Sequence, residues 1–438
     1  MTERQRKVLI VSPRFPPVNS ADQHRVRTSL PFYREFGWVP TVLALTPESS
    51  DGVRDPDLEK TLPPDVRVIR AKAIPEQVTR LFGFGHVDLR CLPALYRAGT
   101  RLLRKERFDL VYFSTTVFNS YVLGRLWKRR FGCRIVFDFQ DPWFEENTGI
   151  YNRGNAPGGW LKYSLSQRIS RRLERFAMRA ADSVVSVSPA YSAMLCQRYE
   201  WLTPEMFTVI PFGAALNDFE VADAMESRQS AFSGSDGLRH VVYVGRGGPD
   251  MLPALTALFS QLALTREEHP ELMEGLRFHF VGTNYSPTNR TFKVVEPEAI
   301  RWGVGDIVFE EPTRVPFFEA IALMRDSDAL LLVGSSQSGY TPSKFLTYVQ
   351  ARKPILALLH RESVAFGLAK RVPWVRLVPL RSGIPSPDGA LEMEAGLLWL
   401  TSVGEVSEEE ESPLSDYSAQ ALTKAQCEVL DRAMGPRS

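Results

Sequence analysis

The chain lacks any recurring pattern of cysteines. Its 438 residues include only four, which lie far apart and form no CxxC pair. This spacing argues against both a zinc site and a disulfide framework, and it favours a reducing compartment.

Long apolar runs are missing as well. No stretch approaches the roughly 18 apolar residues of a membrane span, and the apolar run at residues 8–11 is too short for the core of a signal peptide. We therefore expect a cytoplasmic protein that crosses no membrane.

A strong overall charge is also missing, because the formal net charge is only +2. Residues 1–220 are nevertheless basic and the remainder is acidic. The basic half contains no recognisable nucleic-acid motif, so no nucleic-acid partner is expected. Its arginines and lysines cluster at residues 97–107, 128–130 and 168–179, with leucines between them. Cationic amphipathic helices of this kind can rest on an anionic membrane, although a solvated outer face is the more common explanation. Both interpretations stay open.

The length exceeds one ordinary core and predicts two domains. Continuous apolar runs, typical of strands buried on both faces of a parallel sheet, alternate with helical stretches in each half. A polar stretch at residues 221–238 indicates a linker. We predict an α/β protein with two doubly wound domains, residues 1–220 and 239–405, then an acidic turn and a C-terminal helix in 406–438. Ligands bind at the carboxyl ends of such strands, so two facing sheets imply a central cleft. The runs lie at residues 8–11, 39–45, 109–113, 134–139, 183–187, 207–210, 240–245, 277–281, 307–309, 329–333 and 354–358.

Two loops of the first half follow predicted strands. The first contains Asn19, Ser20 and Asp22 and leads into a helix predicted over residues 23–36. A helix N-terminus suits a phosphate or acceptor hydroxyls, but Ser20 or Asp22 could equally be an ordinary N-cap. The second carries Asp141 in an Asp-Pro-Trp segment directly after a strand. This position favours projection into a cleft, and the alternative is an aspartate that caps the next turn.

Two loops of the second half contain glycine and a basic residue. Gly245 and Arg246 end the first strand of that half, and such a segment can bring backbone N–H groups and a guanidinium to a phosphate. A tight turn is the alternative interpretation. In the other loop Pro342 is predicted to start a helix. Lys344 and Tyr348 are four residues apart and should share one face of it, with the lysine placed as a phosphate ligand.

The order of these motifs resembles bacterial glycosyltransferases of family 4. The resemblance is carried by the segments KVLIVSPRFPPVNSADQHR, FDLVYFSTTVFNSYVLGRLWKRRFGCRIVFDFQDPW, LERFAMRAADSVVSVSPAY, VIPFGAALNDF, VVYVGRGG, FHFVGTN and DALLLVGSSQSGYTPSKFLTYVQARKPILAL. It implies a GT-B fold, in which two Rossmann-like domains face a central cleft and the second domain binds most of a nucleotide sugar. It also implies a retaining reaction without a metal or other cofactor, since basic residues and helix ends neutralise the leaving nucleoside diphosphate.

The same resemblance implies roles for individual residues. Arg246 and Lys344, with Gly245, match the positions that contact the donor diphosphate. Asp141 matches an aspartate at the cleft, which we assign to acceptor positioning or charge stabilisation. The catalytic candidates are thus Asp141, Arg246 and Lys344, and the substrate-binding candidates are Asn19, Ser20, Arg25, Gly245, Gly282, Tyr340, Thr347 and Tyr348.

The chain departs from the family pattern at three places. Thr347 replaces a glutamate that holds the nucleotide ribose, and Gly339 stands where many relatives carry another acid. Loss of such a contact costs about 1–3 kcal/mol, of which a threonine hydroxyl can recover part. Residues 19–22 lack the usual glycines. Gln140 replaces an arginine, and residues 351–354 lack the usual glycine.

The leading prediction is sugar transfer from a nucleoside-diphosphate sugar to a polysaccharide or lipid-linked acceptor of the cell surface, with the basic domain against the inner membrane face. Two alternatives remain: a catalytically silent relative that binds a partner or glycan, which Thr347 motivates, and a sugar-nucleotide epimerase on the same fold.

Overall fold

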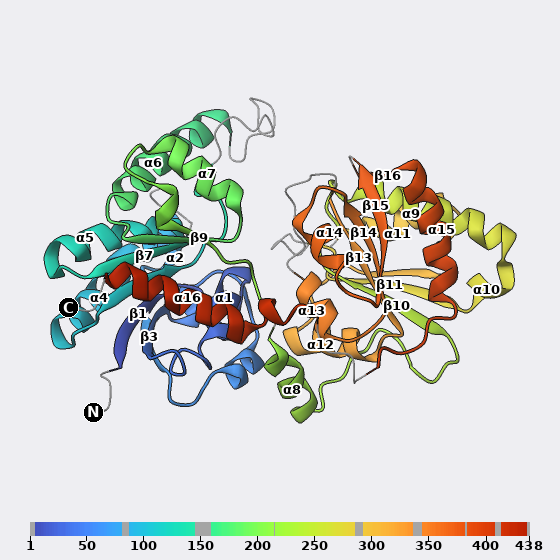
Figure 1. The fold of residues 1–438 in the computed structure, drawn as a ribbon, viewed down its shortest axis with the longest axis horizontal. Helices are drawn as coiled ribbons and strands as arrows, with labels where there is room; N and C mark the ends of the chain where they lie inside the picture. Colours follow the sequence, from blue (N-terminus) through green and yellow to red (C-terminus); the bar gives the residue numbers. More distant parts are fainter. Residues whose placement is uncertain are drawn as a thin grey trace. The chain divides into compact units, whose positions relative to one another are not determined.

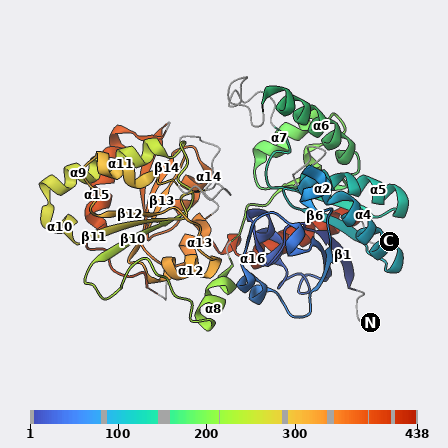
Figure 2. The same ribbon diagram turned by 180° about the vertical axis from the view of Figure 1, so that it is seen from behind.

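The computed structural model describes residues 5–80, 87–144, 159–213, 215–284, 292–335, 344–381, 383–407 and 413–435. The chain forms two compact units, one of Met1–Gly213 with Tyr417–Ser438 and the other of Ala214–Asp416. Each unit contains a seven-stranded sheet with helices packed on it (Figures 1 and 2). The predicted architecture of two parallel-sheet α/β domains is therefore confirmed.

The sheet of the first unit has the order β5-β3-β1-β6-β7-β8-β9, and all of its neighbouring strands are parallel. The sequence analysis did not identify β5, whose arginines interrupt its apolar pattern. A short antiparallel pair joins β2, which is part of the first loop, to β4. The strands are β1 (Arg6–Val11), β2 (Val18–Asn19), β3 (Trp38–Leu45), β4 (Val53–Arg54), β5 (Arg67–Ala71), β6 (Leu110–Ser114), β7 (Arg134–Phe139), β8 (Ser183–Ser186) and β9 (Phe207–Val209).

Side chains of β1 alternate between two apolar cores, one on each face of this sheet. Leu9 and Val11 point into the core under helices α4 and α5, and Val8 and Ile10 point into the core under α16. All four are fully buried, as expected for a strand in the middle of a doubly wound sheet. The helices of this unit are α1 (His24–Ser29), α2 (Glu76–Arg80), α3 (Val87–Arg90), α4 (Leu92–Lys105), α5 (Val122–Phe131), α6 (Trp160–Met178), α7 (Pro189–Arg198) and α16 (Ala419–Met434), with 3-10 turns η1 (Ala21–Gln23), η2 (Pro47–Ser49), η3 (Pro56–Thr61), η4 (Phe118–Tyr121), η5 (Pro204–Met206) and η6 (Ser415–Tyr417).

The C-terminal helix α16 returns to the first unit and packs beside α1. The Trp38 Nε1–H donates to Asp431 at 2.8 Å, and the Gln426 amide donates to Ser29 at 2.8 Å. The sequence analysis placed this helix in a trailing segment of its own, because its amphipathic pattern does not show which sheet it covers. Helix α16 crosses the sheet of this unit and contacts β7 and β8 as well as α1 (Figure 1). The helix predicted over residues 23–36 is also shorter, since α1 ends at Ser29 and turns follow.

The sheet of the second unit has the order β12-β11-β10-β13-β14-β15-β16, in which only the short β16 is antiparallel to its neighbour. The sequence analysis did not identify β15 and β16. The strands are β10 (Arg239–Val244), β11 (Leu276–Val281), β12 (Val308–Glu311), β13 (Ala329–Val333), β14 (Ile355–His360), β15 (Val375–Arg381) and β16 (Ile384–Pro385). The helices are α8 (Leu216–Ala224), α9 (Leu252–Glu268), α10 (Pro270–Glu274), α11 (Val295–Arg301), α12 (Phe317–Asp326), α13 (Phe345–Gln350), α14 (Val364–Ala369) and α15 (Pro387–Leu400).

The division between the units lies at residues 213 and 214, earlier than the expected boundary at residue 220. Helix α8 explains the difference, because its Phe219 packs with Phe318 of α12 in the second unit. The same helix extends into the stretch predicted as a linker at residues 221–238. Part of that stretch is thus ordered by apolar contacts that its polar composition does not suggest. The acidic run at residues 408–411 lies outside the described residues.

Each sheet has a topological switch point. The chain first adds strands on one side of a central strand and then adds the remaining strands on its other side. In the first unit this point lies between β1 and β6, and in the second unit between β10 and β13. Ligands of open α/β sheets bind outside the carboxyl ends of the strands at such points. The predicted site residues are therefore expected at these two edges.

Candidate functional site

The carboxyl end of β10 is held by two side chains of the segment that begins at Lys344. The Lys344 Nζ donates to the carbonyl oxygen of Val244 at 2.8 Å. The hydroxyl of Tyr348 accepts from the Val244 N–H at 2.8 Å. The prediction that the two side chains share one face of the helix is confirmed. Tyr348 is fully buried, so its hydroxyl fixes the end of β10 and is not displayed at the surface.

Lys344 has an unusual electrostatic environment. Burial, reinforced by the neighbouring positive charge of Arg314, lowers the pKa of Lys344 to about 8. A lysine with this pKa is still mostly charged at neutral pH. An anion at this place would favour the charged form, because an opposite charge offsets the burial. The sequence analysis missed Arg314, which follows the carboxyl end of β12 and is exposed. Its position in the loop that follows the strand predicted at residues 307–309 was a weak signal.

Arg246 lies in the loop directly after β10 and forms a two-pronged ion pair with Asp250. The two terminal nitrogens of Arg246 lie 2.8 and 2.7 Å from the two carboxylate oxygens. Burial opposes ionisation of Asp250, but hydrogen bonds from Arg246 and Ser335 outweigh it and lower the pKa of this carboxyl. Ser335 follows β13, so Asp250 connects the loops on both sides of the switch point. The sequence analysis did not single out Asp250.

The remaining predicted residues of the second unit lie close to this edge or outside the described residues. Gly245 follows β10, and its N–H donates to the Val281 carbonyl at 2.9 Å. Gly282 follows β11 with φ of +75°, a conformation that favours glycine. Thr347 is half-buried in α13. The predicted helix start at Pro342 and the candidates Gly339 and Tyr340 lie outside the described residues.

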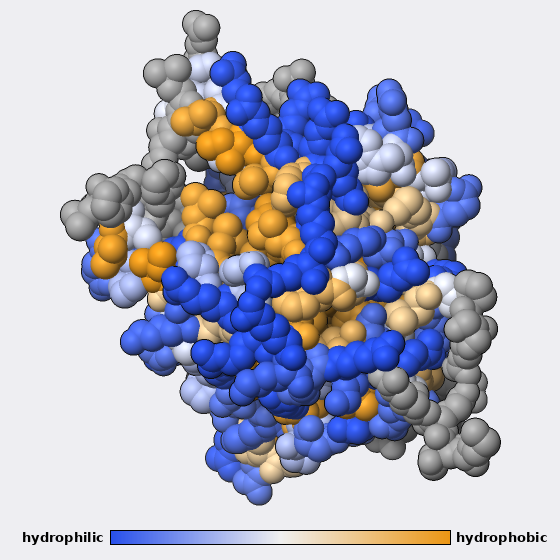
Figure 3. Space-filling model, turned by 90° about the vertical axis from the view of Figure 1, so that its left-hand side faces the viewer, coloured by the Kyte–Doolittle hydropathy of each residue, from blue (hydrophilic) through white to orange (hydrophobic). Residues whose placement is uncertain are grey.

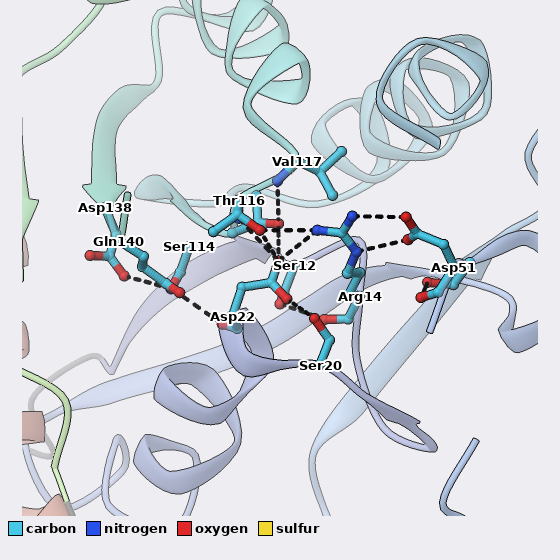
Figure 4. A network of polar contacts seen from close by, with 12 residues as sticks. Ser12, Arg14, Ser20, Asp22, Asp51, Ser114, Thr116, Val117, Asp138 and Gln140 are labelled. Atoms are coloured by element: carbon cyan, nitrogen blue, oxygen red, sulfur yellow. Dashed lines mark hydrogen bonds and ion pairs between the residues drawn. The ribbon is translucent and has the colours of Figure 1, made fainter. Parts of the chain in front are cut away.

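Asp22 joins the two loops at the switch point of the first unit (Figure 4). This carboxylate is 2% exposed. It accepts from the Thr115 hydroxyl at 2.8 Å and from the Thr116 N–H at 3.0 Å. Ser20 donates a further hydrogen bond to Asp22. Asp22 therefore ties the loop after β1 to the loop after β6. The alternative of an N-cap is not seen, because neither η1 nor α1 has a side-chain hydrogen bond at its N-cap.

Arg14 lies on one side of Asp22 and Gln140 on the other (Figure 4). The guanidinium of Arg14 contacts both carboxylate oxygens of Asp51, at 2.8 and 3.0 Å, and lies 3.5 Å from Asp22. The amide of Gln140 donates to the Asp22 carbonyl at 3.2 Å and to the Ser114 hydroxyl at 3.0 Å. Arg14 belongs to the first candidate loop, but Asp51 was not predicted as its partner, because nothing in the local pattern shows that residue 51 returns to this loop.

Arg25 was expected to bind substrate, but the structure places it in the interior. Its Nε lies 2.8 Å from Asp138, and the exposed fractions of the two side chains are 2% and 0%. A second nitrogen donates to the Ile210 carbonyl at 2.6 Å. Its guanidinium therefore bonds to the protein's own groups and links β7 to the segment after β9. A structural role explains the arginine at this position.

The other predicted residues of the first unit are nearer the surface. Asn19 is in β2 and pairs with Val53 of β4. Ser20 is half-buried and its hydroxyl is bonded to Asp22. Asp141 is exposed in the loop after β7. Among the described candidates, Arg25 and Tyr348 position other groups of the protein, whereas Asp141 is exposed.

A metal site does not emerge from the described parts of the chain, where no three histidine, cysteine or acidic side chains come together in a way that could hold an ion. The four cysteines carry free thiols.

Comparison with known proteins identifies the fold. Residues 25–213 match the family model of the glycosyl transferase 4-like domain. No curated protein sequence matches the chain. Solved structures with the same fold include HepE from Anabaena in complex with UDP-glucose, with 14% identity over 97% of this chain and 99% of that chain and a TM-score of 0.58. An α,α-trehalose-phosphate synthase (UDP-forming) from Burkholderia xenovorans, in complex with glucose-6-phosphate, has 12% identity over 98% and 99% of the two chains and a TM-score of 0.59.

The fold is therefore that of a GT-B glycosyltransferase, as the sequence predicted. The first unit carries the glycosyl transferase 4-like domain, which residues 25–213 match.

Proposed function

We propose that this glycosyltransferase moves a sugar, with retention, from a nucleoside-diphosphate sugar bound by the second unit to a polysaccharide or lipid-linked acceptor of the cell surface. The observation that carries the proposal is the group of three cationic side chains, Arg246, Lys344 and Arg314, around the carboxyl end of β10. The complexes of HepE with UDP-glucose and with UDP support a nucleotide sugar as the donor.

The chemistry requires positive charge at this place. When the bond between the anomeric carbon and the diphosphate oxygen breaks, negative charge develops on the diphosphate and an oxocarbenium-like sugar remains. Lys344 and Arg246 would donate hydrogen bonds to the diphosphate and neutralise that charge, and electrostatic stabilisation of this kind is usually the largest single contribution to catalysis. The acceptor hydroxyl would attack from the same face, and its proton would pass to the leaving diphosphate. On this proposal no metal is needed, because the cations of the chain serve the purpose.

The ribose of the nucleotide would lie toward α13. Thr347 is half-buried in this helix, and its hydroxyl would take over part of the contact that a glutamate makes in related sequences. Tyr348 would act indirectly, by holding the backbone of Val244 from which the Gly245 and Arg246 loop begins.

The acceptor would bind to the first unit. Asp141 is exposed at the carboxyl edge of the sheet, and we assign it to acceptor positioning or to stabilisation of the oxocarbenium-like sugar. Asp22 and Arg14 would keep the neighbouring loop in place, since both are bonded to groups of the protein itself. Asn19 and Ser20, in the same loop, are the remaining acceptor-side candidates.

We also propose that the first unit contacts an anionic membrane at the inner face. Leu165, Arg168, Ile169 and Arg172 share one face of α6 by their spacing, and all four are exposed. Leu165 and Ile169 are 58% and 43% exposed. Figure 3 shows apolar patches among hydrophilic side chains on the face of the molecule that the first unit occupies. Among the described residues, no helix combines the length and the apolar character that crossing a bilayer requires, so the contact would be peripheral.

The donor proposal is tested with purified protein and a panel of nucleoside-diphosphate sugars. We expect thermal stabilisation and slow donor hydrolysis with one of them, and loss of both in Lys344→Met and Arg246→Met. Lys370→Met, an exposed lysine of the same unit, is the matched control and should behave like the wild type. If no donor stabilises the protein or is hydrolysed, the proposal is wrong.

The membrane proposal is tested by sedimentation with vesicles at low salt. The wild type should pellet with anionic vesicles and stay in solution with neutral ones. Leu165→Ser combined with Ile169→Ser should reduce pelleting, whereas Ile300→Ser, at an exposed apolar position of the second unit, should not. Equal pelleting of all variants would contradict this role for α6.

A further inference from the structure

The ion pair between Arg246 and Asp250 occupies the guanidinium that the proposed function needs for the diphosphate. Asp250 contacts both terminal nitrogens of Arg246, so the carboxylate engages the same two-pronged edge that a phosphate would engage. The pair is partly exposed, with 34% of the arginine side chain and 24% of the aspartate side chain accessible. A ligand arriving at the carboxyl end of β10 can therefore reach both members.

The pair lies against the backbone of Gly248, which has no side chain. A Cβ atom at Gly248 would lie 2.3 Å from a terminal nitrogen of Arg246 and 2.4 Å from a carboxylate oxygen of Asp250. Any other residue would push both side chains aside. Gly248 has no positive φ among those recorded for this chain, so space for the pair, and not backbone conformation, explains the glycine.

We propose that Asp250 is a positioning residue that holds Arg246 in the absence of donor, yields it to the donor diphosphate, and takes it back as the nucleoside diphosphate leaves. The inference rests on the proposed function and assigns Asp250 to the regulation of donor binding and product release. Asp250 is also hydrogen-bonded to Ser335 across the switch point, so it has a second partner to retain when Arg246 turns to the ligand.

The difference in charge decides whether the guanidinium of Arg246 binds Asp250 or the diphosphate. A diphosphate carries more negative charge than one carboxylate, so it competes successfully for the guanidinium, but it must displace the carboxylate to do so. Removing the charge of Asp250 without changing its size should therefore tighten the binding of nucleoside diphosphates. If Asp250 instead only orients Arg246 for the ligand, the same change should weaken binding.

The experiment compares the wild type, Asp250→Asn and Asp306→Asn by isothermal titration calorimetry with UDP, GDP and ADP. Asp306 is the matched control, because it forms an equivalent two-pronged pair with Arg266 in the same unit, with both distances 2.7 Å, away from the site. We expect Asp250→Asn to lower the dissociation constant of the best-binding nucleoside diphosphate about 3–10-fold, in line with the strength of a partly exposed, charge-assisted pair. Asp306→Asn should leave it unchanged.

A kinetic arm separates this role from a purely structural one. With the donor found for the wild type, Asp250→Asn should lower both KM for the donor and the inhibition constant of the nucleoside diphosphate, and it should lower kcat because the product leaves more slowly. Asp250→Ala, which removes the carboxylate altogether, should shift both constants in the same direction. Thermal unfolding of each variant shows whether it is folded.

The outcomes are distinguishable. If the wild type binds a nucleoside diphosphate and the two Asp250 variants bind it equally or more weakly, this inference is overturned and the proposed function stands. If neither the wild type nor the variants bind any of the three, the donor site itself is wrong and the inference falls with it. Binding by Asp250→Asn alone would support the inference strongly.

Discussion

The pKa of Lys344 leads to a prediction about the pH dependence of donor binding. Burial beside Arg314 lowers this pKa to about 8, from an ordinary value near 10.4. Because one pKa unit corresponds to about 1.4 kcal/mol, keeping the ammonium charged at this place costs about 3 kcal/mol relative to water. A bound diphosphate would offset this cost, but only while the lysine carries its proton.

Affinity for a nucleoside diphosphate should therefore fall as pH rises through 8. With a pKa of about 8 the lysine is mostly protonated at pH 7 and mostly neutral at pH 9. The dissociation constant should rise by up to about tenfold between the two, since the terminal phosphate, with a second pKa near 6, changes little in this range. The stability of the free protein should move the other way. Between the folded pKa of about 8 and the unfolded value near 10.4 the unfolded chain binds more protons, so stability rises with pH.

Isothermal titration calorimetry at pH 7, 8 and 9, with the tightest-binding nucleoside diphosphate, measures the effect. Lys344→Met should bind weakly at every pH and lose the dependence, whereas the exposed control Lys370→Met should retain it. The reasoning is refuted if wild-type affinity is the same at pH 7 and pH 9, or if Lys344→Met shows the same decline as the wild type.

Three further predictions concern stability. Asp138→Asn should destabilise the protein by about 3–5 kcal/mol in urea unfolding, because it leaves the buried guanidinium of Arg25 without its partner; a loss below about 1 kcal/mol would contradict the buried ion pair. Truncation after residue 416 removes α16 and should expose one core of the first unit, seen as increased binding of an apolar dye, and an unchanged signal would argue against the packing described. Gly282→Ala should cost about 1 kcal/mol, since alanine is disfavoured at φ of +75°, and Gly275→Ala, at an ordinary φ, is its control.

Local sequence patterns predicted most of the strands correctly, because apolar runs in a parallel sheet are buried on both faces and stand out from their surroundings. The runs at residues 8–11 and 329–333 are examples. The missed strand β5 contains two arginines near an edge of its sheet, where a strand tolerates charge on its exposed side. Edge strands therefore carry a weaker signal than central ones.

Local patterns also located the donor-side candidates, since Arg246 and Lys344 each lie next to the end of a predicted strand or the start of a helix. They did not show the partners of these residues. Asp250 is only four residues from Arg246, yet its effect depends on the bare backbone of Gly248 beneath the pair. The charge of Arg314 acts on Lys344 because β12 and β10 lie in one sheet, which no short segment reveals.

The sequence by itself determined the two α/β domains, the likeness to a glycosyl transferase 4-like domain in the first of them and the chemical character of the loops, because these depend on the local alternation of apolar and polar residues and on motif order. Only the tertiary structure decided which candidates are displayed and which are buried. It placed Arg25 against Asp138 in the interior, and it returned α16 to the first sheet. The physical reason is that burial and charge pairing depend on residues distant in the chain, whereas the apolar pattern of a strand depends only on the residues of that strand.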